Sequence, residues 1–193
     1  DSNGFIYDEA GITPEKLTFL KDLKNNRRGR IKEYADKYNG VVYHDTNHED
    51  DYNPLWSIPA NCVFPCATQN EINEKDAHNL VKNKITLLCE GANMPVTIGG
   101  INVLIDNGVL YAPGKASNAG GVATSGLEMT QNYMGLHWTS EKVDSTLQSI
   151  MKHVHDTALN TAKEYNKPRN YMVGANIAGF LKVARAMQAQ GII

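Results

Sequence analysis

The chain has 193 residues, 41% of them hydrophobic and 21% charged, so it is long enough for one domain with a sizeable core. Its 19 basic and 21 acidic residues give a formal net charge of -2, which argues against a nucleic-acid or membrane-surface partner. No apolar run approaches the roughly 18 residues that span a bilayer, and we therefore predict no membrane partner.

Short apolar runs alternate with longer helical patterns, which is typical of an open, mainly parallel sheet covered by helices. Each predicted strand carries β-branched or aromatic residues and ends near a turn former. The predicted strands are 41–43, 62–64, 85–89 and 109–112. In the first third of the chain, Thr13-Pro14 predicts a helix from Pro14 toward Asn25, and a second helix should cover about 28–38.

Two further helices should connect the later strands. Asn70 is the predicted cap of a helix that carries Ile72, Ala77 and Leu80, and Thr97 is the predicted cap of the next. Beyond Ser117 the pattern predicts no strand, only helices near 119–134, 140–164 and 171–190. The polar stretch 44–56 should be a surface loop.

The cysteines and histidines do not predict a metal site. Cys62, Cys66 and Cys89 lie in or beside apolar strands, so we expect buried thiols in a reducing compartment rather than metal ligands or a redox pair. His44 and His48 stand among Asp45, Glu49, Asp50 and Asp51, a pattern that favours a solvated acidic loop.

Two runs of small residues each follow a predicted strand. The first is 90–93 (Glu-Gly-Ala-Asn) and the second is 112–129 (APGKASNAGGVATSGLEM). Their small side chains let backbone approach a ligand, while Asn93, Asn118 and Ser125 offer amides and a hydroxyl without charge. Together with 170–180 (NYMVGANIAGF), these runs closely resemble the coenzyme domain of hexameric glutamate dehydrogenases.

The resemblance extends along the whole chain and implies an α/β fold. We expect a partial Rossmann-like open parallel sheet with helices on both faces, followed by C-terminal helices. Residues 1–138 would be a partial dinucleotide-binding domain, and 139–193 a helical segment that packs on it and returns toward a substrate domain outside the chain. The sequence has no G-x-G-x-x-G turn and opens where the second strand of such a fold would end, so we expect a fragment.

The resemblance also implies where the coenzyme binds. The adenosine ribose would meet Asp1 and Ser2, and Lys24 and Arg27 would offset a 2'-phosphate, which favours NADP, with NAD as the alternative. The alternative is that Lys24 and Arg27 are solvated side chains at the end of a helix, where the helix dipole favours positive charge. After the strand at 62–64, Ala67 and Gln69 would line the coenzyme groove, whereas Thr68 either lines it or caps the next helix.

Four residues near the two small-residue runs complete the implied site. Asn93 would reach the nicotinamide ribose, unless it only forms a turn before Pro95, and Asn118 would reach the carboxamide or cap a helix. Ser125 would contact the distal carboxylate of glutamate or 2-oxoglutarate, with Val122 along the carbon chain. The alternative for Ser125 is a contact with a helix neighbour.

The implied function is that of part of an enzyme. A glutamate dehydrogenase oxidatively deaminates L-glutamate to 2-oxoglutarate and ammonia with NADP, reversibly, and works as a homo-hexamer. Its catalytic residues belong to the substrate domain, so we assign none here and expect the isolated chain to be inactive. An NAD-linked dehydrogenase of another amino acid and a non-catalytic binding or assembly module are the alternatives. We expect a cytoplasmic location, with organellar targeting left open.

Overall fold

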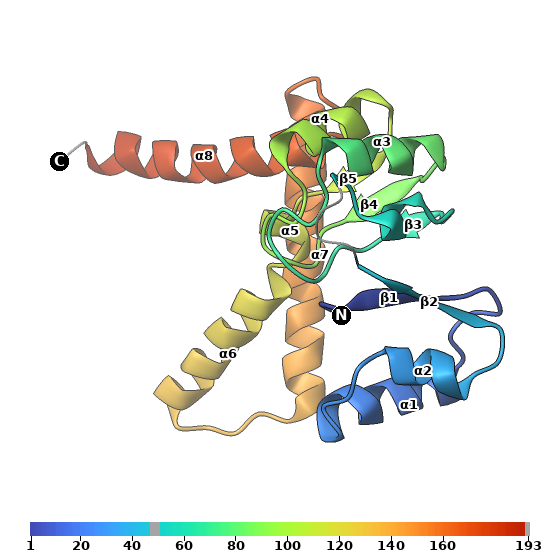
Figure 1. Ribbon diagram of the computed structural model, residues 1–193. Coiled ribbons are helices and arrows are strands. Elements are labelled where there is room, and N and C mark those ends of the chain that lie inside the picture. The colour runs from blue at the N-terminus through green and yellow to red at the C-terminus, as the bar shows by residue number, and fades with distance from the viewer. Residues whose placement is uncertain (47–50, 192–193) are drawn as a thin grey trace. The chain divides into compact units, whose positions relative to one another are not determined.

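The computed structural model describes residues 1–46 and 51–191, which form two compact units, Asp1–Leu55 and Trp56–Ile193 (Figure 1). His48, Glu49 and Asp50 of the acidic loop therefore lie outside the described residues. The boundary expected at 138/139, between a dinucleotide-binding domain and a helical segment, differs from the boundary of these two units and stays a prediction. No helix within the described part combines the length and apolar character needed to cross a bilayer.

The sheet of the first unit differs from the prediction. Strand β1 (Gly4–Asp8) pairs antiparallel with β2 (Val41–Asp45), so the predicted strand at 41–43 is real but does not join a parallel sheet. It also extends through His44 and Asp45, into the stretch 44–56 for which the sequence predicts a loop. Phe5, Ile6 and Tyr7 are strong strand formers, and they find their partner strand more than thirty residues away.

The first helix of this unit begins as predicted, whereas the second begins late. Thr13 caps α1 (Pro14–Lys21), and a π-helical turn, η1 (Asp22–Asn26), continues it. The next helix, α2 (Lys32–Lys37), begins four residues later than predicted. Arg28 has a φ of 56°, a left-handed conformation that an α-helix does not contain.

A buried carboxylate connects β1 with both helices of this unit. The Asp8 side chain is 5% exposed and accepts hydrogen bonds from Lys16 Nζ at 2.6 Å and from the Tyr34 hydroxyl at 2.5 Å. These two bonds, the one from Lys16 first, lower the pKa of Asp8. Burial, with the Asp8 hydrogen bond second, raises the pKa of Tyr34, which keeps its hydroxyl protonated.

Asp8→Asn should therefore destabilise the protein in a pH-dependent way. The folded pKa lies below the unfolded value of about 3.9, so the contribution of the carboxylate is complete above that value and disappears as the pH falls through the folded pKa. Urea unfolding across a pH series should show a deficit for Asp8→Asn at pH 7 that shrinks in acid. The exposed Asp36→Asn is the control, and a deficit independent of pH would contradict the assignment.

The second unit contains the predicted parallel sheet. Its strands are β3 (Cys62–Val63), β4 (Leu87–Cys89) and β5 (Leu110–Ala112), in the order β3-β4-β5, and a short 3-10 helix, η2 (Pro54–Ser57), precedes them. The mixed α/β class and the parallel arrangement are confirmed. The strands are shorter than predicted: β3 ends one residue early, whereas β4 and β5 end as predicted and begin two residues and one residue late.

Helices cover both faces of this sheet. Figure 1 shows α3 (Glu74–Lys82) and α4 (Ile98–Asp106) packed side by side over the strands. On the other face, Leu87 and Leu110 line a cavity with Met151 and Ala158, which belong to the long helix α7 (Ser140–Glu164). Thr97 caps α4 as predicted, because its side chain accepts from Gly100 N at 3.3 Å.

Two local predictions in this unit are wrong. The cap of α3 is Asn73, not Asn70: Asn73 and Asp76 form a reciprocal capping box, and Ile72 lies before the helix, bridged to Val96. Cys62 and Cys66 are exposed and Cys89 is half-buried, whereas we expected buried thiols. The strand β3 lies at the sheet edge and spans two residues, so its flanks remain open to solvent.

Helices follow the sheet, and no described residue after Ser117 forms a strand, as predicted. They are α5 (Gly114–Ser117), α6 (Gly120–Met134), α7 and α8 (Tyr171–Gln190). Helices α7 and α8 pack closely where Gly174 meets the backbone of Ala158. Large apolar side chains on α6 and α8, including Tyr133 and Phe180, are exposed in this structure.

Candidate functional site

Three loops meet at the carboxyl ends of β3, β4 and β5. The backbone N–H groups of Gly91 and Ala92 donate to the Pro65 carbonyl at 2.9 and 3.1 Å, which joins the first loop to the second. The Ser117 hydroxyl donates to the Glu90 carbonyl at 2.5 Å, which joins the second to the third. This edge of an open parallel sheet is where ligands bind in such folds.

Two glycines are required for this close approach. A Cβ at position 91 would collide with the Cys66 sulfur. A Cβ at position 114 would lie 2.9 Å from the Ala92 carbonyl oxygen and 3.0 Å from Glu90 Oε2. The absence of a side chain at both positions therefore allows the loops to pack against one another, as small residues here suggested.

The side chain that holds the loops together is Glu90, for which the sequence analysis gave no role. It is 3% exposed, and its two carboxylate oxygens accept from Gly114 N at 2.5 Å and from Val96 N at 3.3 Å. Backbone groups from two different loops thus depend on one buried carboxylate. Acidic residues directly after a buried strand are the sequence signal that could have indicated it.

Beside these loops lies an open groove of about 490 Å³. It contains three of the predicted site residues, Asn93, Asn118 and Val122, together with Gly91 and Lys115. The Asn118 amide nitrogen donates to the Ala92 carbonyl at 2.9 Å and to Asn93 Oδ1 at 2.7 Å. Within the described residues, Asn118 Oδ1 and the Asn93 amide nitrogen make no hydrogen bond, so an acceptor and a donor remain available there.

The other predicted residues of this unit lie outside the groove lining. Ser125 is exposed on α6, and its hydroxyl donates to the Gly121 carbonyl at 3.3 Å, which is the helix-neighbour contact named above as the alternative. Ala67, Thr68 and Gln69 form an exposed turn that Glu71 holds by accepting from Ala67 N at 3.0 Å. With Asn73 as the cap of α3, Thr68 has no capping role there.

In the first unit, the predicted residues Asp1, Ser2 and Lys24 come together, but with a different arginine. Arg30 Nη1 donates to the Ser2 hydroxyl at 3.1 Å, and Lys24 Nζ lies 3.6 Å from Asp1 Oδ2. Arg27 pairs instead with Asp22 at 3.1 Å and Glu33 at 3.4 Å, with its guanidinium over the Phe19 ring. Arg30 was missed, because the run 27–30 offers three arginines that the sequence cannot rank.

Comparison with known proteins identifies the family of this chain. The family model described as glutamate/leucine/phenylalanine/valine dehydrogenase matches residues 1–191. The chain is 53% identical to the NAD(P)-specific glutamate dehydrogenase of Xylanibacter ruminicola over 192 residues and 48% identical to the NADP-specific glutamate dehydrogenase of Giardia intestinalis over 193. In both comparisons all of this chain is covered, and it spans 42% of the length of the relative.

Solved structures give the same result. The crystal structure of Plasmodium falciparum glutamate dehydrogenase superposes with a TM-score of 0.90 at 45% identity, over all of this chain and 40% of that one. A structure of glutamate dehydrogenase 2 from the same organism gives 0.88 at 47% identity. Because the family model covers nearly every residue and the fold agrees, the chain belongs to the glutamate/leucine/phenylalanine/valine dehydrogenase family.

Proposed function

We propose that the full-length protein is an NADP-dependent glutamate dehydrogenase that converts L-glutamate to 2-oxoglutarate and ammonia reversibly. The identity to relatives that carry this name supports the activity. This chain would supply part of the coenzyme site and one contact to the substrate. As a whole, the protein would be a cytoplasmic homo-hexamer, a state that light scattering on the full-length protein tests directly.

The observation that carries the proposal is the pair Asn93–Asn118 in the groove. A nicotinamide carboxamide offers one donor and one acceptor, and the free Asn118 oxygen and Asn93 amide nitrogen match them. Apart from Lys115, the rest of the groove wall consists of the smaller residues Gly91, Ala119, Gly121 and Val122, which leave room for a flat ring. A bound nicotinamide would supply the hydride acceptor, while this chain orients it and brings no acid or base to the reaction.

The preference for NADP is supported by the charges of the first unit. The Ser2 hydroxyl and the Arg30 guanidinium form a donor pair of the kind that binds a phosphate, and Lys24 adds a second positive charge nearby. Asp1 alone would favour the free ribose hydroxyls of NAD. We therefore assign the 2'-phosphate to Ser2, Lys24 and Arg30, with Arg30 in the role that Arg27 was expected to have.

Arg30→Ala should weaken the affinity for NADPH about 10- to 100-fold, which is the effect of losing one charge-assisted hydrogen bond. Affinity for NADH should change little, because NADH has no 2'-phosphate. Arg27→Ala is the matched control, since it removes the same charge from a residue already paired with Asp22 and Glu33. Titration of coenzyme fluorescence measures both, and equal losses in the two variants would refute the assignment.

Ser125 and Val122 are proposed as substrate contacts on α6. Ser125→Ala should raise KM for glutamate roughly 10-fold through the loss of one hydrogen bond to a carboxylate, and leave KM for NADP unchanged. Thr124→Ala is the matched control, because its hydroxyl also bonds to a carbonyl four residues earlier and is also exposed. Steady-state kinetics of the full-length protein measure both constants. A similar KM for glutamate in the parent, Ser125→Ala and Thr124→Ala would exclude Ser125 as a substrate contact.

The experiment that tests the function itself is glutamate-dependent reduction of NADP and of NAD by the full-length protein. Turnover with NADP that exceeds turnover with NAD is the expected result. Turnover with an apolar amino acid but not with glutamate would instead assign the protein to another activity of its family. No turnover with any amino acid would leave only a binding or assembly role.

A further inference from the structure

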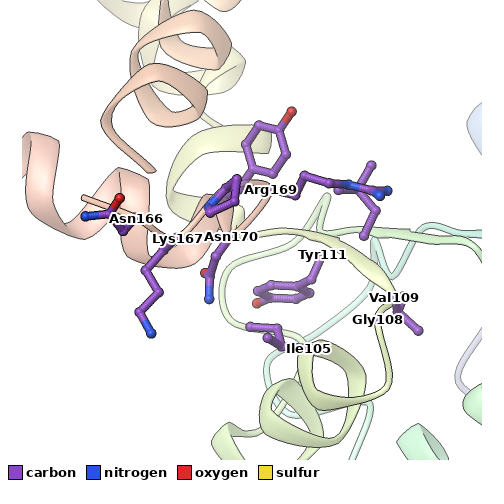
Figure 2. Close-up of a pocket in the computed structure, with 11 residues that line it drawn as sticks. Ile105, Gly108, Val109, Tyr111, Asn166, Lys167, Arg169 and Asn170 are labelled. Carbon is purple, nitrogen blue, oxygen red and sulfur yellow. The ribbon is translucent and has the colours of Figure 1, made fainter. Parts of the chain in front are cut away.

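A second pocket lies at the amino end of β5, on the opposite end of the strand from the loops that form the groove. It has a volume of about 370 Å³ and lies between the end of α4, the start of β5 and the turn that joins α7 to α8 (Figure 2). Ile105 and Val109 give it an apolar wall. None of the residues assigned above to coenzyme or substrate lines it.

The pocket contains a buried donor without an acceptor. Tyr111 is 2% exposed, and within the described residues its hydroxyl makes no hydrogen bond. Burial and the nearby Glu90 carboxylate raise its pKa, yet that carboxylate does not meet it in hydrogen-bond geometry and does not line the pocket. Figure 2 shows the ring between Ile105 and Asn170, with its oxygen on the Asn170 side. An unpaired buried hydroxyl is costly, so a ligand oxygen here would be stabilising.

The rim of the same pocket is positively charged. Lys167 and Arg169 line it, and in the described part of the chain neither forms an ion pair. Asn170 caps the 20-residue helix α8 by accepting from Val173 N at 3.0 Å, and the next backbone N–H groups, those of Tyr171 and Met172, have no partner among the described residues. In Figure 2 the Lys167 and Arg169 side chains point in opposite directions, so only one of these cations can meet a phosphate at the helix N-terminus, which is itself a favourable place for an anion.

We propose that this pocket binds a small phosphorylated metabolite. Its phosphate would accept from the first turn of α8 and from Lys167, and an oxygen of the ligand would accept from the Tyr111 hydroxyl. Ile105 and Val109 would pack against its carbon chain. Because none of the residues assigned to coenzyme or substrate lines this pocket, the proposal does not depend on the coenzyme assignment.

Isothermal titration of the full-length protein with glycerol 3-phosphate, at constant ionic strength, tests the proposal. Tyr111→Phe removes only the hydroxyl and should weaken binding about 10-fold, and Lys167→Ala should weaken it by a similar factor. The controls are Tyr165→Phe and Lys163→Ala, exposed residues near the end of α7 that do not line the pocket, and both should bind as the parent does.

A parallel titration with inorganic phosphate distinguishes the phosphate from the rest of the ligand. Phosphate alone should bind more weakly and depend on Lys167. Thermal unfolding without ligand checks that each variant is folded. Binding that Tyr111→Phe leaves unchanged, or no saturable binding of glycerol 3-phosphate, would overturn the proposal, because water would then satisfy the hydroxyl.

Discussion

Gly174→Ala should lower the free energy of unfolding by about 3 kcal/mol, since overpacking a close backbone contact has a cost of this order. A Cβ at position 174 would collide with the Ala158 carbonyl oxygen and would lie 2.9 Å from its carbonyl carbon and 3.1 Å from Ala162 Cβ. Backbone cannot rotate away as a long side chain can. The helices α7 and α8 would have to separate, and urea unfolding measures the loss.

The control for this change lies in the same helix. Gly179 has nothing within 4 Å of its Cβ position and a helical backbone, so Gly179→Ala should stabilise the protein by about 0.5 to 1 kcal/mol through helix propensity. Opposite signs for the same substitution five residues apart are the expected result. If both variants are stabilised, α7 and α8 do not pack as closely as described.

The second large effect should come from Glu90. Glu90→Ala leaves the N–H groups of Gly114 and Val96 buried without an acceptor, which should lower the free energy of unfolding by about 2 to 4 kcal/mol. Glu90→Gln should lie between this variant and the parent, because one carbonyl oxygen can replace only one of the two acceptors. Urea unfolding of both variants measures the difference.

The exposed Glu128→Ala on α6 is the control for removing a carboxylate, and its stability should stay within about 0.5 kcal/mol of the parent. In the full-length protein, Glu90→Ala should also weaken coenzyme binding, because the loops at 90–94 and 113–118 would no longer be held in register. Unchanged stability together with unchanged coenzyme affinity would show that Glu90 is not the connection between these loops.

The long helices and the three parallel strands of the second unit could be predicted because their signals are local. The bounds of α7 and α8 agree with the sequence prediction, since Thr139 and Asn170 stand as caps before long amphipathic stretches. The positions of Asn93, Asn118 and Val122 in one groove also followed, because parallel strands end at the same edge.

The features that the sequence did not predict depend mostly on contacts between residues far apart in the chain. Strand β1 has the composition of a strand, but its pairing with β2 is decided by tertiary structure. Arg30 meets Ser2 across 28 residues, and no spacing rule distinguishes it from Arg27. Asn73 caps α3 in place of Asn70 because Asp76 stands three residues after it, and Asn70 instead has a φ of 57°.

The contact between Gly91 and Cys66 also has a consequence for how the sequence can change over evolution. The sulfur fills the space that a Cβ at position 91 would need, so a larger residue at 91 can be accommodated only if position 66 becomes smaller. Substitutions at these positions should therefore occur in pairs among related sequences, with alanine at 91 accompanied by glycine or alanine at 66. The side chains at these two positions, 25 residues apart, would then be limited by one shared space, so their combined volume rather than either residue alone would be constrained.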